Sequence, residues 1–330
     1  MKPFAGLPLF AILVLLSGCY AANQLDMDGL KPADITVPGS VRSLTVVSRC
    51  DLDSAYKLSL ESLGRVKDFH RDSIMAKQVV LGCSDALLES PRFDLFNPVV
   101  SRSLVAEDAN TSGTIPWNKV RSIAGDPPHD AVLSLEVATI NDTIKYSILN
   151  GWLSTYQYFV IVKTSWRLYR LADFQSKELN FADTTTFDID SPAEFSSSPD
   201  RGIACISQAM YESGVKTARR LAPWWTDLHR FFFTIITQNS MKGTTFLKEG
   251  NWQEAAEIWR PYTGSSNKMM AAKACFNMAL TCEMANNIPA ALEWLKKSED
   301  LGMLGYFIKL YRSRLIKRKA ETDKLDEQMK

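Results

Sequence analysis

The residue with the clearest potential chemistry is Cys19, which follows Leu-Ser-Gly at residues 16–18. A thiol is nucleophilic in its thiolate form and can accept an alkyl group, and small residues before it let a peptidase approach the backbone. Residues 7–16 are almost wholly apolar, and Lys2 gives the start a positive charge. This layout is typical of a secretory signal peptide. We therefore expect residues 1–18 to be removed and Cys19 to become the first residue.

Residues 16–19 resemble a bacterial lipobox, and this resemblance implies a diacylglyceryl group on Cys19. Two or three acyl chains would hold the protein on a membrane permanently. The apolar run is shorter than the roughly 20 residues that a membrane-spanning helix needs. Tyr20 replaces the Asp that favours inner-membrane retention in enterobacteria, so we expect the outer membrane, with the leaflet left open. An ordinary signal peptide with a coincidental cysteine is the alternative.

Polar residues follow the cysteine, and residues 19–33 are expected to form a flexible tether. Five further cysteines remain in a compartment that permits disulfides. Cys275 and Cys282 stand seven apart on an expected helix, about 10 Å at 1.5 Å per residue, which is too far to bridge. We expect both in the core, while pairing among Cys50, Cys83 and Cys205 stays open.

The other chemistry-bearing residues do not form a catalytic pattern. His129 and Asp130 could act as a base and its orienting carboxylate, but neighbours on a strand point to opposite faces. Residues 196–198 are three serines without the GxSxG motif of a nucleophile elbow. The sequence has no CxxC, no phosphate-binding glycine motif and three scattered histidines. We predict a protein that is not an enzyme, with no cofactor and no metal site.

The elements that would position these residues fall into two predicted domains. Residues 34–230 alternate between strand and helix patterns, which predicts a layered α/β domain with a mixed sheet. The expected strands are 43–50, one that starts within 90–96, 130–141, 156–171 and 178–190, and the expected helices are 72–89, a short one that begins at 114–117 and ends near Gly125, and 199–221.

Residues 234–330 have helical spacing throughout and contain an internal repeat. The segment 250–259 (GNWQEAAEIW) matches the segment 286–295 (NNIPAALEWL), 36 residues later. Gly243 and Ala279 stand where the two helices of each hairpin would touch. The pattern resembles tetratricopeptide repeats, which implies stacked helical hairpins that bind peptides.

The last segment, 305–330, has one apolar stripe and one basic face. The basic face can be the solvated surface of a capping helix, or a contact for anionic lipid or an acidic partner. The tryptophans of the repeat and three residues of the basic face are our candidates for binding a partner. They are Trp252, Trp259, Trp294, Lys309, Arg312 and Arg314.

Aromatic residues are dense in two places. Those between positions 156 and 169 lie on an expected strand pair, where they serve either as sheet core or as an exposed strip for a partner. Those between positions 224 and 233 stand at the expected domain junction, where we expect them to join the two domains.

Residues 76–96, with the sequence SDALLESPRFDLF at the end, resemble the small α/β domains of TolB and of curli-secretion-channel lipoproteins. Residues 166–169 (WRLY) and 222–225 (APWW) resemble motifs of a lipoprotein family of Bacteroidota of unknown function, over roughly residues 1–310. The resemblance implies an α/β domain followed by tetratricopeptide-like helices, and it implies neither an activity nor site residues.

Charge and composition exclude several classes of function. The chain is 46% hydrophobic, which is enough for a real core, and its formal net charge is +1. Removal of Lys2 with the first 18 residues leaves the charges balanced, so we expect no nucleic-acid partner. We expect a membrane-anchored scaffold or adaptor of the cell envelope that binds a protein or peptide. The alternatives are an oligomeric component of a secretion apparatus and an accessory protein acting on cell wall or glycan.

Overall fold

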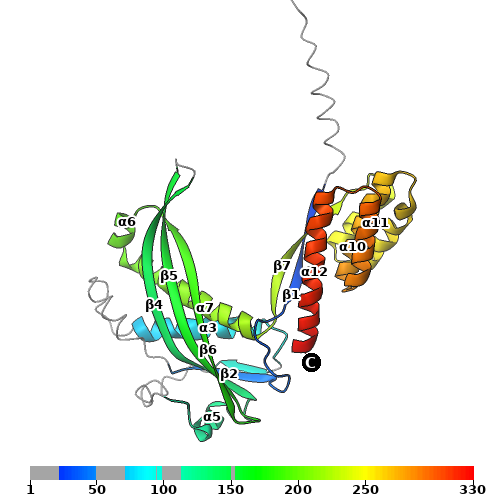
Figure 1. Ribbon diagram of the computed structural model, residues 1–330. Helices are drawn as coiled ribbons and strands as arrows, with labels where there is room; N and C mark the ends of the chain where they lie inside the picture. Colours follow the sequence, from blue (N-terminus) through cyan, green and yellow to red (C-terminus); the bar gives the residue numbers. More distant parts are fainter. Residues whose placement is uncertain (1–21, 50–70, 94, 99–112, 150–152) are drawn as a thin grey trace, which may run out of the picture. The chain divides into compact units, whose positions relative to one another are not determined.

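The computed structural model describes residues 22–49, 71–93, 95–98, 113–149 and 153–330 (Figure 1). It confirms the expected class, a mixed α/β part followed by helices. The chain divides into two compact units. The α/β unit contains Lys31–Trp225 and Leu325–Lys330, and the helical unit contains the described residues up to Leu30 and Thr226–Lys324. Cys19 and Cys50 lie outside the described residues.

Five strands of the described chain form the sheet of the α/β unit, in the order β3-β2-β4-β5-β6. Strand β2 is parallel to both β3 and β4, whereas β4, β5 and β6 are antiparallel neighbours, so the sheet is mixed as expected. The bounds are β2 Ser43–Ser48, β3 Leu95–Pro98, β4 Ala131–Leu149, β5 Leu153–Arg170 and β6 Gln175–Ile189.

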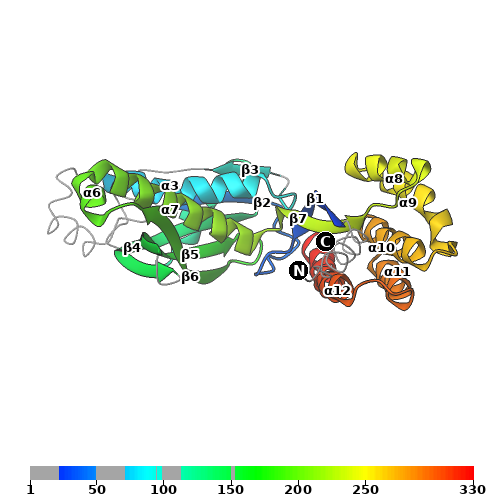
Figure 2. The same cartoon turned by 90° about the horizontal axis from the view of Figure 1, so that it is seen from above.

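Two long helices cover one face of this sheet, α3 (Arg71–Leu88) and α7 (Pro199–Leu221). Figure 2 shows them side by side along the strands. Every second residue of a strand points toward these two helices, and these residues are largely apolar. Tyr158 and Trp166 of β5 are buried among them. The expected aromatic cluster on this strand is therefore largely sheet core.

The opposite face of the sheet carries a smaller cluster around α5 (Trp117–Ile123). Val120 of α5 packs there with Val47, Val132 and Tyr169. Tyr169 is fully buried, and its hydroxyl accepts a hydrogen bond from the backbone N–H of Ile115 at 2.9 Å. This bond ties the segment before α5 to β5. A short helix, α6 (Pro192–Ser197), precedes α7.

The expectation of a flexible tether over residues 19–33 is wrong for most of its length. Residues Ala22–Lys31 form strand β1, which pairs with β7 (Trp224–Phe233) in a two-stranded sheet. Asn23 donates a hydrogen bond to Thr234 at 2.7 Å, and Leu25 is buried. The local composition is polar, but the strand is stabilised by a partner that lies far along the chain.

Helical hairpins make up the rest of the helical unit. Their helices are α8 (Gln238–Lys248), α9 (Trp252–Trp259), the 3-10 turn η2 (Arg260–Gly264), α10 (Lys268–Met284), α11 (Ile288–Asp300) and α12 (Gly305–Gln328). Thr237 begins α8 with a capping box, and the Asn267 and Asn287 side chains accept backbone N–H groups at the starts of α10 and α11. Gly250 follows α8 and Asn286 follows α10, and both residues have a positive φ. This backbone conformation lets the chain turn sharply after each helix.

Candidate binding surface on the helical unit

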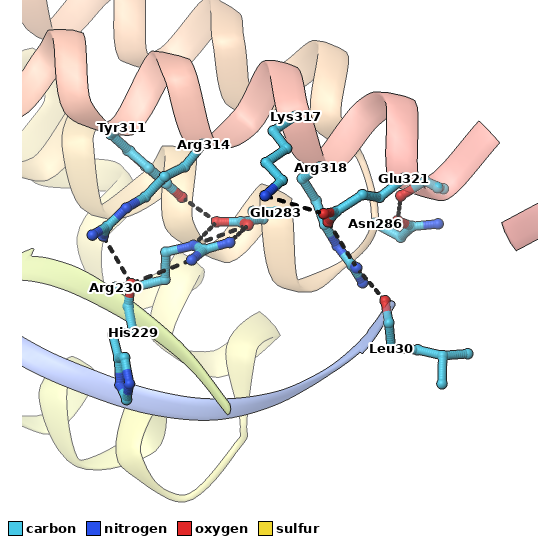
Figure 3. Close-up of polar contacts among 11 residues, drawn as sticks. Leu30, His229, Arg230, Glu283, Asn286, Tyr311, Arg314, Lys317, Arg318 and Glu321 are labelled. Atoms are coloured by element: carbon cyan, nitrogen blue, oxygen red, sulfur yellow. Dashed lines mark hydrogen bonds and ion pairs between the residues drawn. The ribbon is translucent and has the colours of Figure 1, made fainter. Parts of the chain in front are cut away.

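A buried charge cluster holds the helices of this unit together (Figure 3). The guanidinium of Arg230 on β7 donates from Nε and Nη2 to the carboxylate of Glu283 on α10, with distances between 2.6 and 3.0 Å. The Tyr311 hydroxyl on α12 donates to the same carboxylate at 2.8 Å. The side chains of Arg230 and Glu283 are only 7% and 1% exposed. One strand and two helices are therefore joined through a single carboxylate.

The cluster shifts the protonation equilibria of its members. Burial works to lower the pKa of Arg230, but the hydrogen bonds and negative charge of Glu283 outweigh it, and the pKa is raised. Burial raises the pKa of Tyr311 well above its ordinary value, and the Glu283 charge adds to this. Arg230 therefore stays charged and Tyr311 stays protonated at neutral pH. Both groups are fixed as donors and serve as structural members of the unit.

Helix α12 is also fastened to both strands of the two-stranded sheet. Arg314 donates to the backbone oxygen of His229 on β7 at 2.8 Å, and Arg318 donates to the backbone oxygen of Leu30 on β1 at 2.6 Å (Figure 3). These basic side chains thus hydrogen-bond inside the unit. The basic face of this helix is partly used for internal contacts.

The structure places the candidate residues from the sequence in different environments. Trp259 is fully buried, and Gly243 makes room for it, because a Cβ on Gly243 would come within 2.7 Å of the indole nitrogen. The expectation of a partner-binding role for Trp259 is wrong, because its ring belongs to the core. Arg312 is paired with Glu299, and Arg314 is held by His229. Lys309 is exposed.

The two remaining tryptophans, Trp252 and Trp294, are half-buried. Trp252 packs against the core of the helical unit. Trp294 on α11 lies at the rim of that core and lines a surface pocket of about 350 Å³. The structure therefore places Trp294 at a pocket that a partner could enter.

The pocket at Trp294 combines an apolar wall with two charges. The ammonium of Lys297 lies 4.3 Å from the centre of the Trp294 ring, in a cation–π contact. The other lining residues are Thr263, Gly264, Cys275, Asp300 and Leu301. Burial raises the pKa of the Cys275 thiol, so it stays protonated and acts as a small apolar residue. The pocket can hold an apolar side chain while its rim meets polar groups.

Neither Lys297 nor the buried charge cluster was among the sequence candidates. A signal for the cluster was present, since Glu283 is the single acidic residue in the largely apolar stretch 268–284. A lone carboxylate in such a stretch needs a partner in the core. Lys297 carried no comparable signal, because it stands in a run of charged residues typical of a solvated helix face.

The possible catalytic residues of the α/β unit hold strands together. His129 Nδ1 lies 2.7 Å from the hydroxyl of Thr45 on β2. Asp130 accepts hydrogen bonds from the backbone N–H groups of Arg42 and Ser43 and from the Ser43 hydroxyl, at 2.8 to 2.9 Å. The two side chains engage different partners rather than each other. They fasten β2 beside the start of β4.

A second polar pair lies near the bulge of β4, where Arg49 donates to Glu136 at 2.9 Å. Burial raises the pKa of Glu136 although the Arg49 charge opposes it. Perturbed carboxyl groups mark functional sites in many proteins, but structural ion pairs shift pKa values as well. The contact of Arg49 with the backbone oxygen of Gly113 at 3.0 Å favours the structural role.

The described residues lack two other features that would bear on function. No group of three or more His, Cys, Asp or Glu side chains there is arranged to hold a metal ion. Among the helices that the structure describes, none combines the length and the apolarity needed to cross a membrane.

Comparisons with known proteins give two family matches. Residues 41–233 match the model of a domain of unknown function, DUF8603, and residues 241–316 match a second, DUF6340. No curated protein matches the chain.

Two solved structures are similar in part. One is a Helicobacter pylori homolog of neuraminyllactose-binding hemagglutinin, with 11% identity and a TM-score of 0.30, over 57% of this chain and 86% of that one. The other is the PelC dodecamer from Paraburkholderia phytofirmans, with 10% identity and a TM-score of 0.24, over 59% of this chain and 99% of that one.

Proposed function

We propose that this chain, which belongs to the DUF8603 family of domains of unknown function, is a lipid-anchored adaptor of the cell envelope. The family model covers more than half of the chain. The lipid is carried by Cys19, which follows the apolar run and small residues of a lipoprotein signal. The helical unit binds a segment of another envelope protein. The observation that carries this proposal is the pocket at Trp294.

The chemistry of the pocket defines the kind of segment that fits. The indole of Trp294 and the side chain of Leu301 offer an apolar surface, and Lys297 and Asp300 offer one charge of each sign at the rim. An apolar side chain of the partner enters, and polar groups on either side of it meet the two charges. Buried aromatic anchors of this kind dominate the affinity of protein interfaces.

Crosslinking with mass spectrometry on intact cells tests the proposal. The native chain is compared with Trp294→Ala and Lys297→Glu, and Lys296→Glu is the matched control because Lys296 is exposed and does not line the pocket. Truncation of a central aromatic anchor costs about 2 kcal/mol or more, roughly thirtyfold in affinity. We expect crosslinks from α11 to one partner to disappear in both pocket variants and persist in the control.

Two outcomes would count against this function. A partner captured equally by the native chain and both pocket variants would place binding elsewhere. Crosslinks lost equally with Lys296→Glu would mean that general charge, rather than the pocket, is responsible. Circular dichroism of Trp294→Ala shows whether the helical unit stays folded.

A second candidate function is assembly into an oligomer through the α/β unit. Strand β6, 15 residues long, is an edge of the sheet that the structure describes, and its outward residues are exposed. Edge strands pair readily with other chains. A defined oligomer in light scattering of detergent-extracted protein, reduced to a monomer by Ala182→Lys, would support this function. A monomer at high concentration would exclude it.

A further inference from the structure

Exposed apolar side chains of the helical unit gather at one end of it. Among the described residues of this unit, five large apolar side chains are at least 42% exposed, and four of them belong to the segments that begin α8 and α12. These four form what we call the terminal patch: Ile236 at 87%, Met241 at 60%, Leu304 at 42% and Tyr306 at 70%. The fifth, Ile316, lies farther along α12.

Ring contacts bring the two parts of the terminal patch to the same end. The Tyr306 ring lies 5.4 Å from the Phe307 ring, and the Phe307 ring lies 5.1 Å from that of Phe233, the last residue of β7. Ile236 follows three residues after Phe233. Met241 is in the first turn of α8, with its backbone N–H donating to the Thr237 oxygen.

Strand β1 begins at this same end. Asn23 contacts Thr234, Asp26 contacts His229, and a Cβ on Gly29 would meet Leu228, so the strands run in opposite directions. The start of β1 therefore lies beside the end of β7. Figure 1 shows the start of β1 and the start of α12 at one end of the helical unit, and the contact of Arg318 with Leu30 lies farther along both.

The chain length limits how far this end can be from the lipid. Cys19 is three residue steps before Ala22, the first residue of β1. At about 3.6 Å per residue, three steps span at most about 11 Å. A lipid on Cys19 thus keeps the terminal patch near the bilayer surface, within reach of the headgroup region.

We propose that the terminal patch of the helical unit lies in the headgroup region of the bilayer, as a second, non-covalent contact beside the lipid. This inference rests on the proposed lipid anchor at Cys19. Tyrosine is enriched at membrane interfaces, and apolar side chains enter the boundary between headgroups and acyl chains. Lys242 and Lys309 are exposed next to the patch and suit anionic headgroups. The contact limits the orientations that the helical unit takes on the membrane.

Hydroxyl-radical footprinting of the full lipidated chain tests the contact, in vesicles of phosphatidylethanolamine and phosphatidylglycerol. Tyr306 is compared with Tyr146 of the α/β unit, which is 53% exposed. Although Tyr306 is the more exposed of the two in the protein, we expect it to be oxidised several-fold less than Tyr146 on vesicles. Met241 should be protected in the same way.

A pair of variants links the protection to the apolar side chains. Ile236→Ser combined with Leu304→Ser should raise oxidation of Met241 several-fold on vesicles. Ile316→Ser is the control, because it removes an apolar side chain of the same unit that is 58% exposed and lies outside the patch. This control should leave Met241 protected.

The intact mass of each sample separates the possible failures. If Cys19 carries lipid but Tyr306 is oxidised as fast as Tyr146, the membrane contact is overturned and the anchor stands. If Cys19 carries no lipid, the anchor is overturned together with this inference. If protection persists in the double serine variant, or is the same without vesicles, a protein rather than the bilayer covers the patch, and the inference fails.

Discussion

Glu283 shows how much of the helical unit depends on one side chain. Its carboxylate is almost fully buried and accepts hydrogen bonds from Arg230 and Tyr311. A buried charge is tolerated when it is paired and hydrogen-bonded, whereas loss of one partner leaves the other charge uncompensated. The Arg312–Glu299 pair on the surface of the same unit is exposed to water, so its strength is largely screened.

Replacement of Arg230 by Met should therefore destabilise the helical unit by about 3–5 kcal/mol. Urea unfolding followed by circular dichroism measures the change. Arg312→Met is the control, and it should cost less than about 1 kcal/mol because that pair is exposed. Adding Glu283→Leu to Arg230→Met should restore part of the loss, since the uncompensated charge is then gone. Equal losses for Arg230→Met and Arg312→Met would contradict the argument.

Asp130 predicts a pH dependence of the α/β unit. Burial works to raise its pKa, but the hydrogen bonds from Arg42 and Ser43 and the charge of His129 outweigh it, and the pKa is lowered. The folded pKa is below the unfolded value of about 3.9, so the stability from this group is complete above that pH. It is lost as the pH falls through the lowered folded pKa.

Asp130→Asn keeps the shape of the side chain and cannot titrate. Its free energy of unfolding should fall less than that of the native chain when the pH is lowered below about 4. Chemical unfolding at a series of pH values, with Asp188→Asn as an exposed control, provides the comparison. Parallel pH curves for the native chain and Asp130→Asn would show that Asp130 contributes nothing to the dependence.

At the scale of elements, the contact between α3 and α7 depends on two glycines. A Cβ on Gly214 would lie 2.0 Å from the Val79 oxygen, and one on Gly82 would lie 2.0 Å from the Tyr211 oxygen. The obstructing atoms are backbone, so they cannot move aside as a flexible side chain would. Gly202, also on α7, would meet only the Phe195 ring at 3.9 Å.

Gly214→Ala should push the two helices apart and destabilise the α/β unit by about 1–3 kcal/mol. Gly202→Ala is a matched control on the same helix, and it should be neutral or stabilise by up to about 1 kcal/mol, because Ala favours the helix more than Gly does. Thermal unfolding of both variants measures the difference. Equal effects would mean that helix propensity, and not close approach, dominates at Gly214.

Periodicity in the sequence predicted most of these elements. The spacing of apolar residues on α7 and on β2 is local information, so the expected bounds differ little from those observed. Strand β1 was missed because half of its residues are polar or charged and only Leu25 and Met27 alternate with Asp26 and Asp28, while the pairing with β7 stabilises it. Such a pairing is tertiary information that no window of residues contains.

The candidate site was predicted less well, for a related reason. The repeat aromatics were identified by type, but residue type does not tell whether an indole faces the core or the solvent. Trp259 is in the core because Gly243 makes room beside it, whereas Trp294 lies at the pocket rim. At the repeat offset of 36 residues, Trp259 corresponds to the buried Leu295 and Trp294 corresponds to Ile258, so the two indoles occupy neighbouring rather than equivalent repeat positions.

At the scale of the whole molecule, the two units have separate hydrophobic cores. One contains residues from the sheet, α3 and α7, and the other contains residues from β1, β7 and the hairpin helices. Units with separate cores need not unfold as one cooperative transition.

Calorimetry should therefore resolve two transitions. Arg230→Met should lower the midpoint temperature of one transition by roughly 10 °C or more. A loss of about 1 kcal/mol lowers the midpoint temperature of a unit of about 100 residues by several degrees. Gly214→Ala should lower the other and leave the first unchanged. A single transition that both variants shift equally would show that the chain unfolds as one cooperative body.

The pairing of β1 with β7 has a consequence for the order in which the chain folds. Asn23 and its partner Thr234 are 211 residues apart, so β1 stays unpaired until a much later segment of the chain has been made. Closing so long a loop is slow compared with local folding. Throughout that interval β1 is an open edge, and under the proposed lipid anchor at Cys19 this edge would lie beside the lipid, where a chaperone that shields unpaired strands would find its client.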